Sequence, residues 1–250
     1  MNISAACQRS TVAENPDQLR KEALRAEHEI TYQITGDTGK ASEYTISFDE
    51  KFNLIPESVE GEPWTKLENH QCPNCPYTRE QLEYCPVALA ISQVLFSVED
   101  AASTENVHCE VITRERRFSA EVDYQKAIYS ILGLLMATSG CSRFSFLRPA
   151  ARLHLPFATL EETVTRNISF YLLTQYFRNP DISLKQGLDL LTEQFAELEQ
   201  VNRALIERVR SRLKQGDVHS NAMVVLSSFS QVLSMDPELA SGLVSDMFHT

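Results

Sequence analysis

The sequence predicts an α+β protein in which a small antiparallel sheet of about four strands, with a covering helix, is followed by an all-helical bundle. In the first half of the chain, apolar and polar residues alternate in two stretches, which is the period of half-buried strands. From Tyr124 onward, apolar residues recur at helical spacing instead. We therefore expect a flexible N-terminal arm (1–28), an α+β part with a cysteine cluster (29–123) and a helical bundle (124–250). The last two parts are expected to pack as one unit.

The expected sheet is made of two hairpins. The residues GDTG form the turn of the first hairpin, and a charged stretch over 114–117 forms that of the second. The covering helix begins near Pro86, because proline is tolerated in the first helical turn. The alternating apolar positions are Ile30, Tyr32, Ile34, Tyr44, Ile46 and Phe48 in the first hairpin, and Val107, Cys109, Val111, Phe118, Ala120 and Val122 in the second.

Capping patterns predict where two helices of the bundle begin. Thr159 with Glu162 forms a capping-box pattern for a helix that runs to Arg178. Ser183 with Gln186 forms another, for a long helix that reaches residue 214 or so. A last pair of helices is expected beyond it.

The long helix carries leucines at strict heptad spacing, a pattern typical of coiled coils. A second copy of the chain is therefore one candidate partner, in a homodimer formed through the helix 184–214. Val201 and Ile206 flank the seam and widen the apolar stripe, as in a helix that packs inside a globular core. We favour packing within the chain. The leucines are Leu184, Leu191, Leu198 and Leu205.

The composition restricts the classes of partner. The chain has 34 acidic and 23 basic residues and a formal net charge of -11 at pH 7, which argues against general nucleic-acid binding. Its longest apolar stretch, around 127–137, is shorter than the roughly 20 residues that a membrane span needs. The N-terminal residues contain no apolar signal region. We expect a soluble, cytoplasmic protein without a membrane span.

One segment departs from this acidic composition, since no Asp or Glu occurs from Tyr124 to Leu160. The segment contains Arg143, Arg148 and Arg152, whose planar guanidinium groups suit a phosphate or a carboxylate. One hypothesis is that these arginines bind a small anion. The alternative, which we favour, is that they pair with acidic residues elsewhere in the chain.

Three of the six cysteines lie within fourteen residues, at Cys72, Cys75 and Cys85. Without a secretion signal, clustered thiols indicate a metal or redox site rather than disulfide bonds. The spacing of Cys72 and Cys75 lets both thiolates bind one ion at about 2.3 Å, and Cys85 adds a third sulfur. The pattern predicts a structural zinc site.

A closed zinc site needs a fourth ligand. Cys141 follows an apolar helix that Gly140 ends, so its thiol could reach the other cysteines, and we rank it first. His70 lies two residues before Cys72 and ranks second, and His154 ranks third. Two of these residues could serve together if one of them contacts the ion only through a hydrogen bond.

Other interpretations of the cysteines stay open. Each of the three clustered cysteines precedes a proline, as cysteines beside iron–sulfur clusters also do, so an iron–sulfur cluster is the alternative cofactor. The Cys-x2-Cys pair could be a redox dithiol, although such pairs normally open a helix. The cysteines could also be small buried apolar residues and nothing more.

No nucleophile elbow, phosphate-binding glycine loop, dinucleotide fingerprint or His-Glu-x2-His pattern occurs in the sequence. We therefore expect a protein without catalytic activity, in which a zinc site joins the two parts of the chain. Such a protein would be an interaction or regulatory module with a protein partner that the sequence does not identify. The alternative is an iron–sulfur or thiol redox protein or sensor.

Five strings hold most of these motifs: HQCPNCP, YCPVALAI, RERRF, LGLLMATSGC and FLRPAARLHLPFATLEET. Their combination resembles an uncharacterised bacterial domain family, and the likeness extends from about Ile30 to the helices near the C-terminus. The resemblance implies a bacterial, cytoplasmic protein built as a single module. It brings no activity, metal or catalytic residue to this chain.

Overall fold

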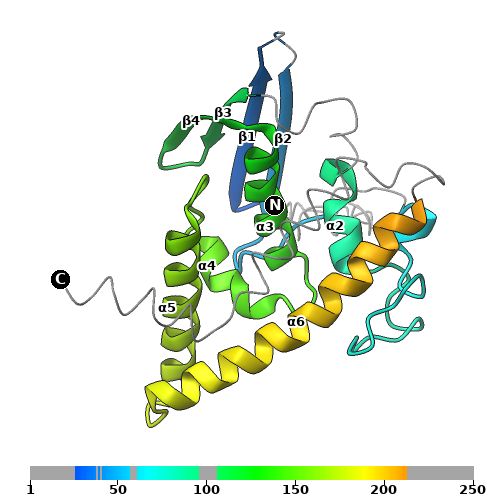
Figure 1. Ribbon diagram of the computed structural model, residues 1–250, viewed down its shortest axis with the longest axis vertical. Helices are drawn as coiled ribbons and strands as arrows, with labels where there is room; N and C mark the ends of the chain where they lie inside the picture. Colours follow the sequence, from blue (N-terminus) through cyan, green and yellow to red (C-terminus); the bar gives the residue numbers. More distant parts are fainter. Residues whose placement is uncertain (1–25, 38, 40, 57–60, 96–105, 213–250) are drawn as a thin grey trace, which may run out of the picture.

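The computed structural model describes residues 26–37, 39, 41–56, 61–95 and 106–212. The predicted N-terminal arm, apart from its last residues, and the predicted helix pair near the C-terminus lie outside the described residues. The described part has the predicted α+β architecture, with the sheet at one end of the molecule and the helices packed below it (Figure 1).

Four antiparallel strands form the sheet, in the order β2-β1-β3-β4. Both predicted hairpins are present, and pairing of β1 with β3 joins them into one sheet. Alternate side chains of β1, β2 and β3 are buried, as the period-two pattern predicts. The bounds are β1 His28–Gly36, β2 Ala41–Phe48, β3 Asn106–Ile112 and β4 Arg117–Asp123.

The shorter helices form a layer beneath the sheet, and the long helix α6 crosses below them. Among them, α3 contacts β3 and β4, whereas α2 packs on α3 and on η1. The N-terminal half of α6 packs on α5, and its far end reaches η1 and the cysteine-bearing loops (Figure 1). The bounds are η1 Pro63–Thr65, α2 Pro86–Leu95, α3 Tyr124–Thr138, η3 Ser145–Leu147, α4 Arg148–Arg152, α5 Leu160–Arg178 and α6 Leu184–Arg212.

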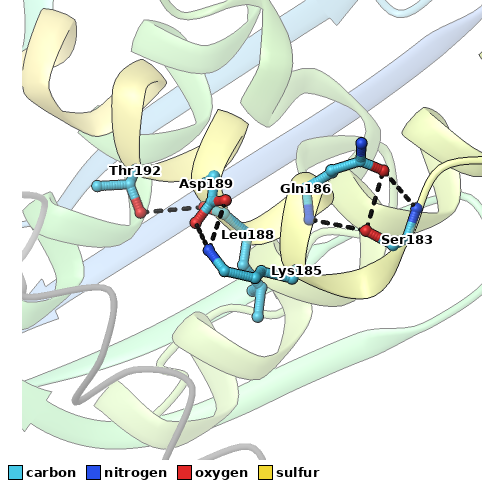
Figure 2. A network of polar contacts seen from close by, with 6 residues as sticks. All are labelled: Ser183, Lys185, Gln186, Leu188, Asp189 and Thr192. Atoms are coloured by element: carbon cyan, nitrogen blue, oxygen red, sulfur yellow. Dashed lines mark hydrogen bonds and ion pairs between the residues drawn. The ribbon is translucent and has the colours of Figure 1, made fainter.

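Both predicted caps are present. The Thr159 hydroxyl accepts a hydrogen bond from the Glu162 amide at 3.1 Å, and the Glu162 carboxylate accepts one from the Thr159 amide at 2.7 Å. At the start of α6, the Gln186 amide donates to the Ser183 hydroxyl at 3.2 Å, and the Gln186 side chain accepts from the Ser183 amide at 2.9 Å (Figure 2). Reciprocal bonds of this kind satisfy backbone donors that a helix start leaves unpaired.

Two apolar clusters hold these layers together. The larger cluster contains the inward face of the sheet, α2, α3 and the C-terminal half of α6, and the smaller one lies between α5 and α6. Phe146 and Phe195 contact both clusters, with ring centroids 5.5 Å apart, so the two are continuous. The α6 members of the larger cluster are Leu198, Val201, Leu205 and Val209.

The heptad face of α6 is therefore used largely within the chain. Leu191, Leu198 and Leu205 are buried, while Leu184 is 66% exposed. A homodimer through this helix stays a prediction. No helix in the described ranges is long and apolar enough to span a membrane.

Candidate metal centre

Residues 61–85, here called the cysteine segment, hold Cys72, Cys75 and Cys85 in an irregular loop rather than a helix. The Cys75 amide donates to the Cys72 carbonyl at 3.0 Å, which closes a tight turn around the intervening residues. A tight turn between two cysteines of this spacing is typical of metal-binding knuckles. A redox dithiol would normally lie at a helix start, and this pair does not.

Cys85 is positioned by backbone pairing within the cysteine segment. Its amide donates to the Thr65 carbonyl at 2.8 Å, and the Leu67 amide donates to the Glu83 carbonyl at 2.9 Å. Cys85 is buried and directly precedes Pro86, the first residue of α2.

Cys141 approaches the knuckle from the other half of the chain. Gly140, with φ +86°, ends α3 in the left-handed region that glycine tolerates, and Cys141 follows it. The Tyr77 hydroxyl donates to the Gly140 carbonyl at 3.3 Å. Arg143 donates from Nε and Nη2 to the Asn74 carbonyl at 2.9 Å and 2.7 Å. These bonds join the Cys141 loop to the turn between the first two cysteines.

The four thiols lie close enough to influence one another electrostatically. Burial raises the pKa of the Cys72 thiol to about 12, and the thiols of Cys85, Cys75 and Cys141 add to the rise, while Arg208 opposes it. Burial also raises the pKa of Cys141, although amide hydrogen bonds to its sulfur oppose the shift. Without a metal ion, the thiols of Cys72 and Cys141 are therefore protonated at neutral pH, and bound metal would have to displace those protons.

Arg208, from α6, is a fully buried cation beside the cysteine segment. It is 1% exposed and donates from Nη2 to the Leu67 carbonyl at 2.6 Å and from Nη1 to the Lys66 carbonyl, while its Nε has no partner among the described residues. No carboxylate of a described residue forms an ion pair with it. A buried charge is costly unless an opposite charge compensates it.

The four thiols share one neighbourhood but do not form a finished ligand set. Among the residues that the structure describes, no three or more Cys, His, Asp or Glu side chains are arranged to hold a metal ion. A bound ion would have to draw the sulfurs together.

The other candidate ligands have different surroundings. His70 is exposed and makes no hydrogen bond or ion pair with a described residue. His154 hydrogen-bonds to Tyr32 and Ser130, in a separate region of the molecule. Cys109 is buried in β3, where burial raises its pKa to about 12, and Cys7 lies outside the described residues.

The three arginines of the acid-free segment do not meet at one point. Arg143 pairs with Glu197 and binds the cysteine segment. Arg148 donates to the Asn53 side chain, and Arg152 donates to the Glu50 carbonyl at 3.4 Å. An anion site formed by these arginines therefore stays a prediction, and Arg143 already has a carboxylate partner.

Arg208 was not anticipated from the sequence, although a signal for it exists. It occupies a position between Leu205 and Val209 on the apolar stripe of α6, where a charged residue is unusual. The functional meaning of that position depends on the cysteine segment, which is more than a hundred residues away in the chain.

Comparison with known proteins identifies a family. No curated protein and no solved structure matches this chain. A family model described as a domain of unknown function (DUF6901) matches residues 30–248, which agrees with the extent of the resemblance noted from the sequence. Because the match spans most of the sequence, the chain belongs to the DUF6901 family.

Proposed function

We propose that this protein is a non-catalytic interaction or regulatory module in which Cys72, Cys75, Cys85 and Cys141 hold one zinc ion. The ion would join the cysteine segment to the loop that follows α3. In this role zinc contributes to folding and not to chemistry, because four protein ligands leave no open position.

The observation that carries the proposal is the convergence of four cysteines from separate parts of the chain. A backbone hydrogen bond closes the turn between Cys72 and Cys75, and Cys85 acts electrostatically on Cys72. The contacts of Tyr77 and Arg143 bring in the loop of Cys141. Buried structural cysteines need no such convergence, since each can fill a separate place in a core.

Charge balance supports the same proposal. Four thiolates around one divalent zinc ion carry a net charge of about −2 by the formal charges of these groups. Arg208 is a buried cation without a carboxylate partner among the described residues, and its charge already acts on Cys72. A tetrathiolate site would supply the missing negative charge.

Elemental analysis of the purified full-length chain tests the proposal. We expect about one zinc per chain in the wild-type protein and a large loss of zinc in Cys72→Ser and Cys141→Ser. Cys109→Ser is the matched control, because Cys109 is buried but lies in β3, and it should retain the metal. Wild-type protein without metal, or equal zinc in all variants, would contradict the proposal.

An iron–sulfur cluster is the second candidate, favoured by the proline that follows each cysteine of the cysteine segment. Anaerobic purification followed by a visible spectrum separates the two, because zinc proteins are colourless and iron–sulfur proteins are brown. Stoichiometric iron and sulfide in place of zinc would assign the same cysteines to a redox protein or sensor.

A further inference from the structure

A cavity of about 650 Å³ lies between α3, α4 and α5, away from the cysteine segment. Its volume is within the range of small-molecule binding sites. Most of its wall is apolar, so it suits a ligand with a hydrocarbon body. Apolar wall residues include Leu134, Met136, Phe144, Leu147, Phe157 and Leu160.

The polar part of the wall comes from three elements. Ser130 of α3, His154 after α4 and Arg166 of α5 all line the cavity. The Tyr32 hydroxyl, on β1, hydrogen-bonds to the Ser130 hydroxyl at 2.9 Å and to Nε2 of His154. Ser130 Oγ and His154 Nε2 are 3.4 Å apart. Burial, together with the charge of Arg166, lowers the pKa of His154 to about 3, so this imidazole is neutral at physiological pH.

Arg166 differs from these neighbours because it is charged and incompletely bonded. Its Nε and Nη1 atoms are buried and have no hydrogen-bond partner among the described residues. Glu162, one turn earlier in α5, acts on it electrostatically, but that carboxylate caps the helix through the Thr159 amide and forms no ion pair with it. Buried donors without partners are rare in folded proteins and often mark a site for a missing acceptor.

The charges that line the cavity sum to one positive charge. Asp123 and Lys126 offset each other, and Asp123 is also bonded to the Lys126 amide as the cap of α3. His154 contributes no charge. The remaining charge is that of Arg166, so a ligand with one negative charge would leave the site neutral.

We propose that this cavity binds an amphipathic carboxylate, with its head on Arg166 and its apolar body along the walls formed by α3 and α4. A carboxylate fits better than a phosphate monoester, whose second negative charge would find no partner in the wall. This inference is independent of the metal proposal, since none of the four cysteines lines the cavity.

Calorimetric titration of the full-length chain with octanoate, 1-octanol and octyl phosphate tests the proposal. We expect octanoate to bind at least about tenfold more tightly than 1-octanol, because a hydrogen bond to a charged group is worth that much. Octyl phosphate should bind more weakly than octanoate. No octanoate binding at millimolar concentration, or equal binding of octanoate and octanol, would overturn the proposal, and tighter binding of octyl phosphate would overturn the choice of a carboxylate.

Substitutions of Arg166 separate recognition from folding. Arg166→Gln should remove the preference for octanoate over octanol, and Arg166→Lys, which keeps the charge, should retain part of it. Arg178→Gln is the matched control, because Arg178 is exposed at the end of the same helix, and it should bind like the wild-type protein.

The melting temperature of the ligand-free variants completes this test. Arg166→Gln should melt at or above the wild-type temperature, because it removes buried donors that have no partner. A large fall in melting temperature, or an octanoate preference that survives in Arg166→Gln, would show that Arg166 serves the fold and would overturn the proposal.

Discussion

Arg208 and Arg166 both have buried guanidinium nitrogens, and they differ in what surrounds them. Arg208 has both terminal nitrogens on backbone carbonyls of the cysteine segment and is 1% exposed. Arg166 has two buried nitrogens without partners in the part of the chain that the structure describes, and it lines an open cavity. Neither forms an ion pair with a carboxylate of the described residues.

This contrast shows two ways to compensate a buried positive charge. Around Arg208 the space is filled by the protein, so the compensating charge has to come from its own neighbours, and the thiols nearby are the groups that can become negative. Arg166 lines a cavity, so the compensating charge can enter from solution. The first arrangement indicates a structural site, and the second indicates a ligand site.

The largest effect should follow metal removal. Chelation of the wild-type protein, or Cys72→Ala, should lower the free energy of unfolding by at least about 3 kcal/mol, because binding energy at a structural zinc site is folding energy. Thermal melting with and without chelator measures this. Unchanged melting in both cases would mean that the cysteine region does not depend on a metal and that Arg208 is compensated in another way.

Arg208→Met tests the compensation directly and should have the next largest effect. In metal-loaded protein we expect a loss of about 2 to 3 kcal/mol, because the substitution leaves the thiolates and two carbonyls without their partner. After chelation the loss should be smaller, since the substitution then also removes an uncompensated charge. Arg203→Met is the control, because Arg203 is exposed on the same helix. Equal losses in the free energy of unfolding before and after chelation would mean that Arg208 does not compensate the charge of a metal site.

Local sequence patterns predicted the helices and strands, whereas contacts between residues far apart in the chain were harder to predict. The hairpins and both capping boxes follow from patterns between neighbouring parts of the sequence, and Gly140 correctly indicated that Cys141 begins a new loop. The orphan nitrogens of Arg166 could not be foreseen, because the cavity exists only where three helices and a strand meet. The sequence shows Arg208 as a charged residue on the apolar stripe of α6, but it does not show that the cysteine segment packs against this arginine.

The next prediction concerns pH and the cavity. His154 has a folded-state pKa of about 3, lowered by burial and then by Arg166, whereas an unfolded histidine titrates near 6.5. Between about pH 3 and pH 6.5 the unfolded state therefore binds one more proton than the folded state. The free energy of unfolding should fall as the pH drops below 6.5, by up to about 1.4 kcal/mol per pH unit.

His154→Gln should reduce this slope, because glutamine can still bond to Tyr32 and Ser130 but does not titrate. Denaturant unfolding at pH 7.0, 6.0 and 5.0, in both proteins, gives the difference in slope, and contributions from all other groups cancel in it. Identical slopes would mean that His154 is not held neutral and that the charge balance of the cavity needs revision.

The smallest effect is expected at the start of α5, the helix that supplies Arg166 to the cavity but none of the four cysteines. Thr159→Ala removes the hydroxyl that accepts the Glu162 amide and should lower the free energy of unfolding by about 1 kcal/mol. Thr174→Ala is the control, since this hydroxyl bonds only to a carbonyl within the helix and alanine is the better helix former. Zinc content should be unchanged in both variants. A loss of zinc in Thr159→Ala would show that the cavity region and the cysteine region are coupled, so that the charges of Arg166 and Arg208 are not compensated independently.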